Sequence, residues 1–382
     1  MTIRSPKRRP AATLLRAVPG VLAGLLLLAA CSTPYRPPVI LERDTRFPGL
    51  VDLPAQARGR SAEVLLVHGI CTHDARWAQQ VVAQLGRSID GATVSPASIA
   101  GADTNDIEIV PSTVDTAAGR LRFHALIWSP LTTPLKRQLC DDQTDKSAAC
   151  TGAPPYPHRR ALWNARLKDT LIDDCLPDAL IYQGVARDTI QLRMREAILR
   201  VLGSVTPSDE EADKLPLVVI AHSMGSKIMF DTLLRMGEEA PGSRAAVTAR
   251  RTMARLRMLV MAANQLPLLS LADQPLDTGS ARTAQPDSLQ RLLHQRAGDG
   301  RRTAATLTVV AFSDPNDALS YTLPAQRYAG QGVSVHNILV SNAPTWLGLL
   351  ERPDRAHLDY LNNPDVGRLV ACGVPASALC VK

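Results

Sequence analysis

The chain has 382 residues, 45% of them hydrophobic and 21% charged, so it is long enough to bury one large core or two smaller ones. Its formal net charge is +7, but five of the 43 basic residues and none of the 36 acidic residues lie in residues 1–30, which leaves +2 for the rest. No stripe of Lys and Arg with interleaved aromatic residues is present, so the sequence argues against a nucleic-acid partner.

Residues 1–30 have the pattern of a targeting segment. Five basic residues precede the apolar run VLAGLLLLAA at residues 21–30, which is short for a membrane-spanning helix. Residues 28–31, LAAC, resemble the lipobox of bacterial lipoproteins. That resemblance implies cleavage before Cys31, lipidation of Cys31 and a lipid anchor in the cell envelope, and Ser32 favours the outer membrane, facing the periplasm. A plain secretory signal, an uncleaved anchor and a cytoplasmic enzyme are the alternatives.

Lipidation of Cys31 would leave six cysteines in an oxidising compartment, where disulfides persist. Two pairs are close in the sequence, and each is expected to close a short loop, while the remaining two cysteines are either paired with each other or free. In that order these are Cys140 with Cys150, Cys372 with Cys380, and Cys71 with Cys175. No Cys-x-x-Cys or His-x-x-x-His spacing occurs, so no metal site is expected.

Residues 31–60 mix proline, glycine and charge without clear periodicity, and they predict a tether between the lipid and a folded domain. The domain then opens with a nearly all-apolar run at residues 63–67, typical of a strand that is covered on both faces. His68-Gly69 turns the chain, and residues 74–85 have helical spacing.

Strand and helix patterns continue to alternate along the chain, which predicts an α/β fold with a mostly parallel central sheet and helices on both faces. No repeat occurs, so we expect one domain over residues 61–382, with the irregular stretch at about 130–177 inserted as a cap or flap. A plain surface excursion is the alternative for that stretch. The later strands are expected at residues 119–129, 216–221, 256–263, 305–313 and 333–341, and the helices at 188–203, 225–237 and 366–373.

An apolar strand runs directly into a serine and then a helix at residues 218–228, VVIAHSMGSKI. A strand, a sharp turn at Ser223 and a helix from Gly225 resemble the nucleophile elbow of the α/β-hydrolases. The turn needs small residues two positions to either side of the serine, and here these are Ala221 and Gly225. Ala221 departs from the glycine that is commonest at its position.

His68 and Gly69 end the first core strand, where α/β-hydrolases build half of their oxyanion hole. The resemblance implies that the backbone N–H groups of Ile70 and Met224 face the charge that develops on a carbonyl oxygen during acyl transfer. The alternative is a His-Gly pair that only ends a strand.

In this fold the acid and then the histidine follow the serine along the chain. Asp314 and Asp317 both follow the strand at 305–313, and Asp317 is preferred because such acids stand a few residues past the strand and just before an apolar residue. Asp314 is the alternative acid, and both could instead be turn formers. His357 is the expected base because it lies between the last strand and the last helix. The other histidines in this part of the chain fit less well: His222, His294 and His336.

The resemblance to α/β-hydrolase serine esterases and lipases covers the chain from about residue 60 onward. It implies a hydrolase without cofactor in which Ser223 attacks an ester carbonyl, His357 takes the serine's proton and Asp317 orients the imidazole. The expected substrate is an ester or lipid-like small molecule. Acyl transfer, thioester cleavage and a non-catalytic envelope lipoprotein that uses the fold as a binding scaffold are the alternatives.

Several other side chains are candidates for the edge of the site. The resemblance gives Asp178 and Tyr182 a structural or pocket-edge position. Trp77, Trp128 and Trp346 are candidates to line an acyl pocket, although aromatic residues near core strands more often pack in the core.

Overall fold

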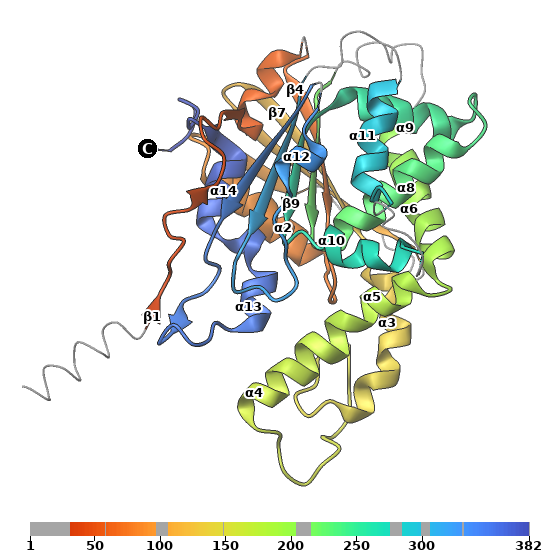
Figure 1. Ribbon diagram of the computed structural model, residues 1–382, viewed down its shortest axis with the longest axis vertical. Helices are drawn as coiled ribbons and strands as arrows, with labels where there is room; N and C mark the ends of the chain where they lie inside the picture. Colours follow the sequence, from red (N-terminus) through yellow and green to blue (C-terminus); the bar gives the residue numbers. More distant parts are fainter. Residues whose placement is uncertain are drawn as a thin grey trace, which may run out of the picture.

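The computed structural model describes residues 31–57, 59–96, 106–147, 149–203, 215–275, 285–298, 306–330 and 332–381. The predicted signal peptide, residues 1–30, lies outside these ranges. Within them the chain forms a nine-stranded sheet with helices around it (Figure 1). No helix in the described ranges is long and apolar enough to cross a membrane.

The sheet has the strand order β2-β11-β10-β9-β8-β4-β7-β6-β5, and the six strands from β11 to β7 are parallel. Their carboxyl ends therefore share one edge, where the functional sites of such sheets usually form. The predicted mostly parallel α/β sheet is confirmed. The parallel strands are β4 (Ser61–Val67), β7 (Gly119–Ile127), β8 (Leu217–His222), β9 (Leu256–Ala262), β10 (Leu307–Ser313) and β11 (Val333–Leu339).

Both faces of the sheet are covered because successive side chains of a strand point to opposite sides. In β4, Leu65 belongs to one buried apolar cluster and its neighbour Leu66 to the other. The first cluster includes residues from α6 (Arg187–Leu202), α8 (Gly225–Glu238), α9 (Arg244–Arg255) and α11 (Ser288–Gly298). The second includes residues from α2 (Ala75–Arg87) and α14 (Pro364–Cys372).

Two antiparallel strands, β5 (Thr93–Pro96) and β6 (Glu108–Thr116), extend the sheet beyond β7 and are absent from the sequence prediction. In β6, buried residues alternate with partly exposed ones, and Pro111 interrupts the run. A search for continuous apolar runs therefore passes over this strand.

The tether predicted at residues 31–60 is wrong for most of its length. β2 (Val39–Ile40) pairs with β11 at the sheet edge, and β3 (Phe47–Pro48) pairs with β13 (Gly373–Val374). The helical turns η1 (Leu50–Asp52) and η2 (Pro54–Gln56) follow, and Leu50 is fully buried. A few isolated apolar residues dock this segment, and they show no periodicity that could reveal it in the sequence.

The insertion predicted at about 130–177 is helical at both ends, whereas the described part of residues 143–161 between them has no helix or strand, and it projects away from the sheet (Figure 1). Its last three helices follow one another without a break, and their outward side carries apolar residues while several aspartates are buried, which inverts the usual helical pattern. The elements are α3 (Ser129–Lys136), η3 (Arg137–Asp142), α4 (Leu162–Ala165), the π-helix η4 (Arg166–Cys175) and α5 (Leu176–Gln183).

Three disulfides join the six cysteines that follow Cys31, whereas Cys31 itself is free and exposed. Both predicted local pairs are confirmed, and the open question of the remaining two is answered by a bond between them. The pairs are Cys140–Cys150, Cys372–Cys380 and Cys71–Cys175.

Candidate active site

Ser223 lies at the carboxyl end of β8, in a sharp turn into α8. Its φ of 53° is in the left-handed region, which costs a non-glycine residue roughly 1–3 kcal/mol. The Ser223 N–H donates to the carbonyl oxygen of Ala262 on the neighbouring strand at 2.7 Å and fixes the turn. Strained backbone at one buried serine is a feature of sites where a side chain must be presented in one direction.

Two glycines allow the ends of β4 and β8 to approach each other. A Cβ atom on Gly225 would lie 2.4 Å from the carbonyl oxygen of His68, and one on Gly69 would lie 2.5 Å from the Cβ of Ser223. Neither position tolerates a side chain without displacing backbone. Ala221 is fully buried within β8, so the extra methyl group at the position of the commoner glycine is accommodated.

The serine hydroxyl is the first member of a hydrogen-bonded series. Ser223 Oγ lies 3.0 Å from Nε2 of His357, and Nδ1 of His357 lies 2.9 Å and 3.0 Å from the two carboxylate oxygens of Asp317. The three residues come from separate elements: the turn after β8, the loop after β10 and α13 (Pro353–Leu358). His222 Nε2 lies 3.0 Å from the carbonyl oxygen of His357 and helps to hold that helix in place.

Asp317 is buried and accepts several hydrogen bonds. Besides His357, the donors are the N–H of Leu319 at 3.0 Å and the hydroxyl of Tyr360 at 3.0 Å. Burial by itself would raise the pKa of the Asp317 carboxyl, but the hydrogen bond to His357 and the other donors outweigh it and lower the pKa. The group is therefore a carboxylate that can orient an imidazole.

The alternative acid, Asp314, has different partners. Its two oxygens accept hydrogen bonds from the N–H groups of Asn316 at 2.9 Å and Asn342 at 2.7 Å. It also faces Glu351, and burial together with the charge of Asp314 raises the pKa of Glu351 to about 7. Asp314 thus closes the turn, and the structure brings Asp317 rather than Asp314 to the imidazole.

The turn that contains Ile70 is held by His68. The backbone N–H of Trp128 donates to Nε2 of His68 at 2.9 Å, and Nδ1 of His68 donates to the carbonyl oxygen of Gly69 at 2.8 Å. Burial holds the pKa of His68 well below its ordinary value, so the ring is neutral as these bonds require. Within the described ranges, neither the N–H of Ile70 nor that of Met224 donates a hydrogen bond, so both are available to a ligand.

The three tryptophans proposed for an acyl pocket have different positions. Trp128 is fully buried and stacks on His68 with the ring centroids 4.9 Å apart, so it is a core residue. Trp77 packs edge-on against the same imidazole. Trp346 is 59% exposed and pairs with Cys31, so it does not line this site.

The residue after Ile70 is tied to the insertion. Cys71 is bonded to Cys175 at the end of η4, and its N–H donates to the carboxylate of Asp178 at 2.8 Å. Lys136, also buried, reaches Asp178 at 3.1 Å and Asp174 at 2.9 Å. Burial raises the pKa of Asp178 to about 6, against the opposing effect of Lys136. The insertion therefore fixes the start of the loop that bears one candidate oxyanion donor.

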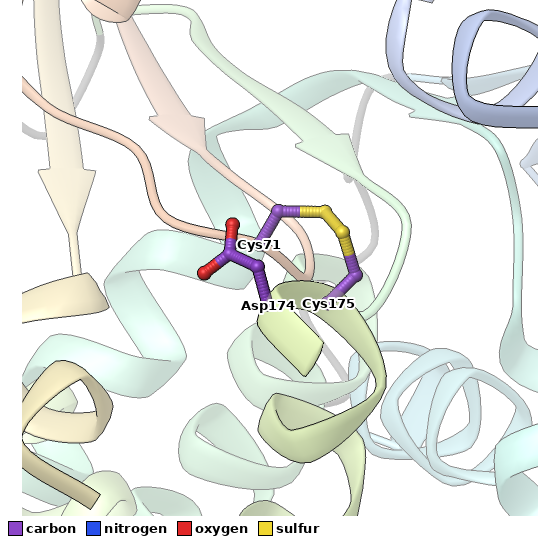
Figure 2. A group of neighbouring side chains, drawn as sticks. All are labelled: Cys71, Asp174 and Cys175. Atoms are coloured by element: carbon purple, nitrogen blue, oxygen red, sulfur yellow. A yellow bond between two sulfur atoms is a disulfide. The ribbon is translucent and has the colours of Figure 1, made fainter. Parts of the chain in front are cut away.

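In the described ranges, a single group of three side chains has the spacing of metal ligands: Cys71, Asp174 and Cys175 (Figure 2). Both sulfurs are used by the disulfide, so neither is a thiolate that can bind a metal. Asp174 is paired with Lys136. This cluster is better described as a covalent and ionic clamp than as a metal site.

The site is closed in this structure. Ser223 has no exposed surface and His357 is 1% exposed. The side-chain amide of Gln265 lies 3.4 Å from Nε2 of His357, and η4 of the insertion packs against α13, which carries that histidine. Sequence reasoning had no signal for Gln265, because it follows β9 and belongs to no recognised motif.

No protein-family model matches the chain, and no curated protein is significantly similar to it. The chemical argument therefore depends on the arrangement of side chains alone. A buried hydroxyl, an imidazole and a carboxylate in hydrogen-bonded series can transfer the hydroxyl's proton to the imidazole while the carboxylate stabilises the resulting charge.

Proposed function

We propose that the chain is a serine hydrolase of the α/β-hydrolase type that cleaves carboxylic esters through an acyl-enzyme. The observation that carries the proposal is the series Ser223–His357–Asp317, in which hydrogen bonds of 2.9–3.0 Å join a strained serine to an oriented imidazole. In the proposed reaction, Ser223 Oγ attacks the carbonyl carbon while His357 Nε2 takes the hydroxyl proton.

The remaining steps follow from the same geometry. The N–H groups of Ile70 and Met224 would stabilise the oxyanion of the tetrahedral intermediate, and each donor of this kind typically contributes about 3–4 kcal/mol to the transition state. His357 then protonates the leaving alcohol, which breaks the ester bond and leaves the acyl group on Ser223. Water, deprotonated by His357, attacks that acyl group and regenerates the serine.

The topology supports the assignment. The three residues lie after β8, after β10 and after β11, all at the carboxyl edge of the parallel strands. Their order along the chain, serine, then acid, then histidine, is the order of the α/β-hydrolase fold. Convergence of three separate segments on one hydrogen-bonded series is difficult to explain by packing alone.

The insertion favours an apolar, lipid-like acyl substrate. Large apolar side chains are exposed at intervals of four residues along α4, η4 and α5. One interval is five residues, and it lies inside the π-helix, where hydrogen bonds run from i to i+5. Two residues of this apolar face lie on η4, and η4 packs on α13, the helix that carries His357. The residues of the face, called here the flap stripe, are Trp163, Leu167, Ile172, Leu176 and Leu180.

The experiment is a series of p-nitrophenyl esters from acetate to palmitate, assayed with the parent chain, Ser223→Ala and Ser288→Ala. Ser288 is a buried serine at the start of α11 and serves as the matched control. We expect turnover in the parent and the control and its loss in Ser223→Ala, with the long-chain esters preferred. Equal turnover in Ser223→Ala would refute the proposed nucleophile, and a preference for acetate would refute the lipid-like substrate.

A further inference from the structure

The described part of the chain begins with a short strand next to a surface loop. β1 (Cys31–Ser32) pairs antiparallel with β12 (Thr345–Trp346), with Cys31 opposite Trp346 and Ser32 opposite Thr345. The hydroxyl groups of Ser32 and Thr345 are 2.7 Å apart. The loop after β12 is therefore fixed beside the point at which residues 1–30 join the described structure.

That loop, residues 346–350 and called here the anchor-side loop, contains four large apolar residues around one glycine and no charge. Transfer of such side chains from water into an apolar environment is favourable. The loop is nevertheless closed and outward-facing, since the N–H of Trp346 donates to the carbonyl oxygen of Leu350 at 2.7 Å. The exposed fractions are 59% for Trp346, 46% for Leu347, 77% for Leu349 and 46% for Leu350.

The sequence before Cys31 indicates what covers this loop. Residues 21–30, VLAGLLLLAA, are all apolar or glycine, and they join the described structure at Cys31. With a diacylglycerol on the Cys31 thiol, the acyl chains begin at this residue. With an uncleaved apolar segment, the chain leaves the bilayer at the same residue. Both forms place the bilayer surface at Cys31, one strand pairing away from Trp346.

We propose that the anchor-side loop docks on the lipid bilayer to which Cys31 is attached, with Trp346 at the headgroup level and the leucines towards the acyl chains. A tryptophan flanked by leucines on an uncharged loop has the composition of an interfacial membrane contact. An apolar contact beside the anchor would add to the attachment and, above all, restrict the orientation of the domain on the bilayer.

The docking itself is independent of the proposed hydrolase function, but the direction from which substrate reaches the site rests on that function. α13 begins at Pro353, three residues after Leu350, and it carries His357. A bilayer at the anchor-side loop would therefore lie on the side of the molecule from which α13 and the adjacent η4 cover the site, and substrate would arrive from the membrane rather than from bulk water.

The test uses the full acylated chain in vesicles of phosphatidylethanolamine and phosphatidylglycerol, with fluorescence quenching by lipids brominated in the acyl chains. Trp346 is observed in a Trp163→Phe background, and the signal of a Trp163→Phe/Trp346→Phe variant is subtracted to remove Trp77 and Trp128. The matched control adds Leu192→Trp to that double variant, because Leu192 is 47% exposed on α6, which packs on α8 and α9.

We expect Trp346 to be blue-shifted and to lose most of its emission, while the tryptophan at position 192 is unaffected. Leu349→Ser/Leu350→Ser should reduce the quenching of Trp346. Equal quenching at the two positions, or a chain that does not float with the vesicles, would overturn the proposal. Ser223→Ala should give the parent result, so a failure of the hydrolase assignment is separate from a failure of the docking.

Discussion

The two aspartates after β10 differ in what they hold, although they are only three residues apart. Asp317 accepts hydrogen bonds from the imidazole of His357 and from Tyr360, whereas Asp314 binds the backbone of its own turn and of residue 342. Only Asp317 is therefore able to fix the tautomer of His357. The hydroxyl of Tyr360 also accepts the N–H of Asp314 at 2.7 Å, so it links the two aspartates.

Asp317→Asn is expected to lower the rate of Ser223 acylation by about 10⁴-fold, because the amide favours the wrong tautomer of the His357 imidazole. The measurement is stopped-flow acylation by an activated ester. Asp314→Asn is the control, and it should change the rate by less than about tenfold while lowering the free energy of unfolding. A larger rate loss in Asp314→Asn than in Asp317→Asn would exchange the two roles.

Gly225→Ala tests the close approach of β4 and β8. Its Cβ would lie 2.4 Å from the carbonyl oxygen of His68, so the backbone must shift, at a cost of about 1–3 kcal/mol in the free energy of unfolding. Gly237→Ala is the matched control in the same helix, where the Cβ meets only the flexible end of Gln295. Helix propensity predicts that it stabilises the protein by up to about 1 kcal/mol. The free energies of unfolding of both variants are measured with denaturant. Equal stability of the two variants would refute the close approach of β4 and β8 at Gly225.

The sequence was sufficient to select Ser223, Asp317 and His357, because chain order and position after strands are properties that a sequence carries. It was not sufficient for Gln265 or Glu351. These residues reach the site through packing between segments that are far apart along the chain, and no local spacing reports such contacts.

The disulfide between Cys71 and Cys175 connects the loop that follows β4 to the insertion across 104 residues, whereas Cys140 and Cys150 are 10 residues apart. A longer closed loop restricts the unfolded chain more, so the first bond should contribute about 2 kcal/mol more to stability. We therefore expect Cys71→Ser/Cys175→Ser to lower the free energy of unfolding by more than Cys140→Ser/Cys150→Ser does. Urea unfolding of both double variants tests this, and the reverse ranking would contradict it.

Glu351 links the loop that follows β11 to the turn that contains Asp314 and Asp317. Its carboxyl accepts hydrogen bonds from the side-chain amide of Asn316 at 2.8 Å and from the N–H of Ala343 at 2.9 Å. Its pKa is raised to about 7 in the folded protein from an ordinary 4.5, so folding favours its protonated form. The stability that this group contributes is complete below about pH 4.5 and is lost as the pH rises through 7.

Glu351→Gln, whose amide replaces the protonated carboxyl, should therefore weaken the fall in stability between pH 5 and pH 8. The measurement is the free energy of unfolding of parent and variant across that range, with the exposed Glu238→Gln as a control. An unchanged pH dependence in Glu351→Gln would show that the pair formed by Glu351 and Asp314 does not cause the fall in stability between pH 5 and pH 8.

The parallel strands were predictable, because β4, β8, β9 and β10 contain apolar runs and because β7 and β11 alternate apolar with polar residues over part of their length. Three features were not. β6, which lies between β7 and the edge strand β5, alternates around a proline. Residues 39–57 dock through a few separate contacts, and the helices of the insertion carry apolar residues on their outward side. In the first two cases tertiary packing outweighs the local pattern, and in the third the burial of the aspartates reverses it.

For the whole molecule, the flap stripe should matter only when the substrate is presented at an apolar surface. Leu176 and Leu180 are 40% and 66% exposed, so replacing both by serine should cost little stability. We expect Leu176→Ser/Leu180→Ser to lower turnover of micellar long-chain esters severalfold and to leave a soluble short-chain ester unchanged. Parallel loss on both substrates would mean that these residues act on the site itself.

Intact-mass spectrometry after treatment with a fluorophosphonate measures whether Ser223 is an activated nucleophile. The parent should gain one adduct, mapped to Ser223, and both Ser223→Ala and His357→Ala should lose it while circular dichroism shows that they remain folded. Detergent micelles should be included, because Ser223 is fully buried in the closed structure. A folded parent that gains no adduct with or without micelles, or an adduct that persists in Ser223→Ala, would show that Ser223 is not the activated nucleophile.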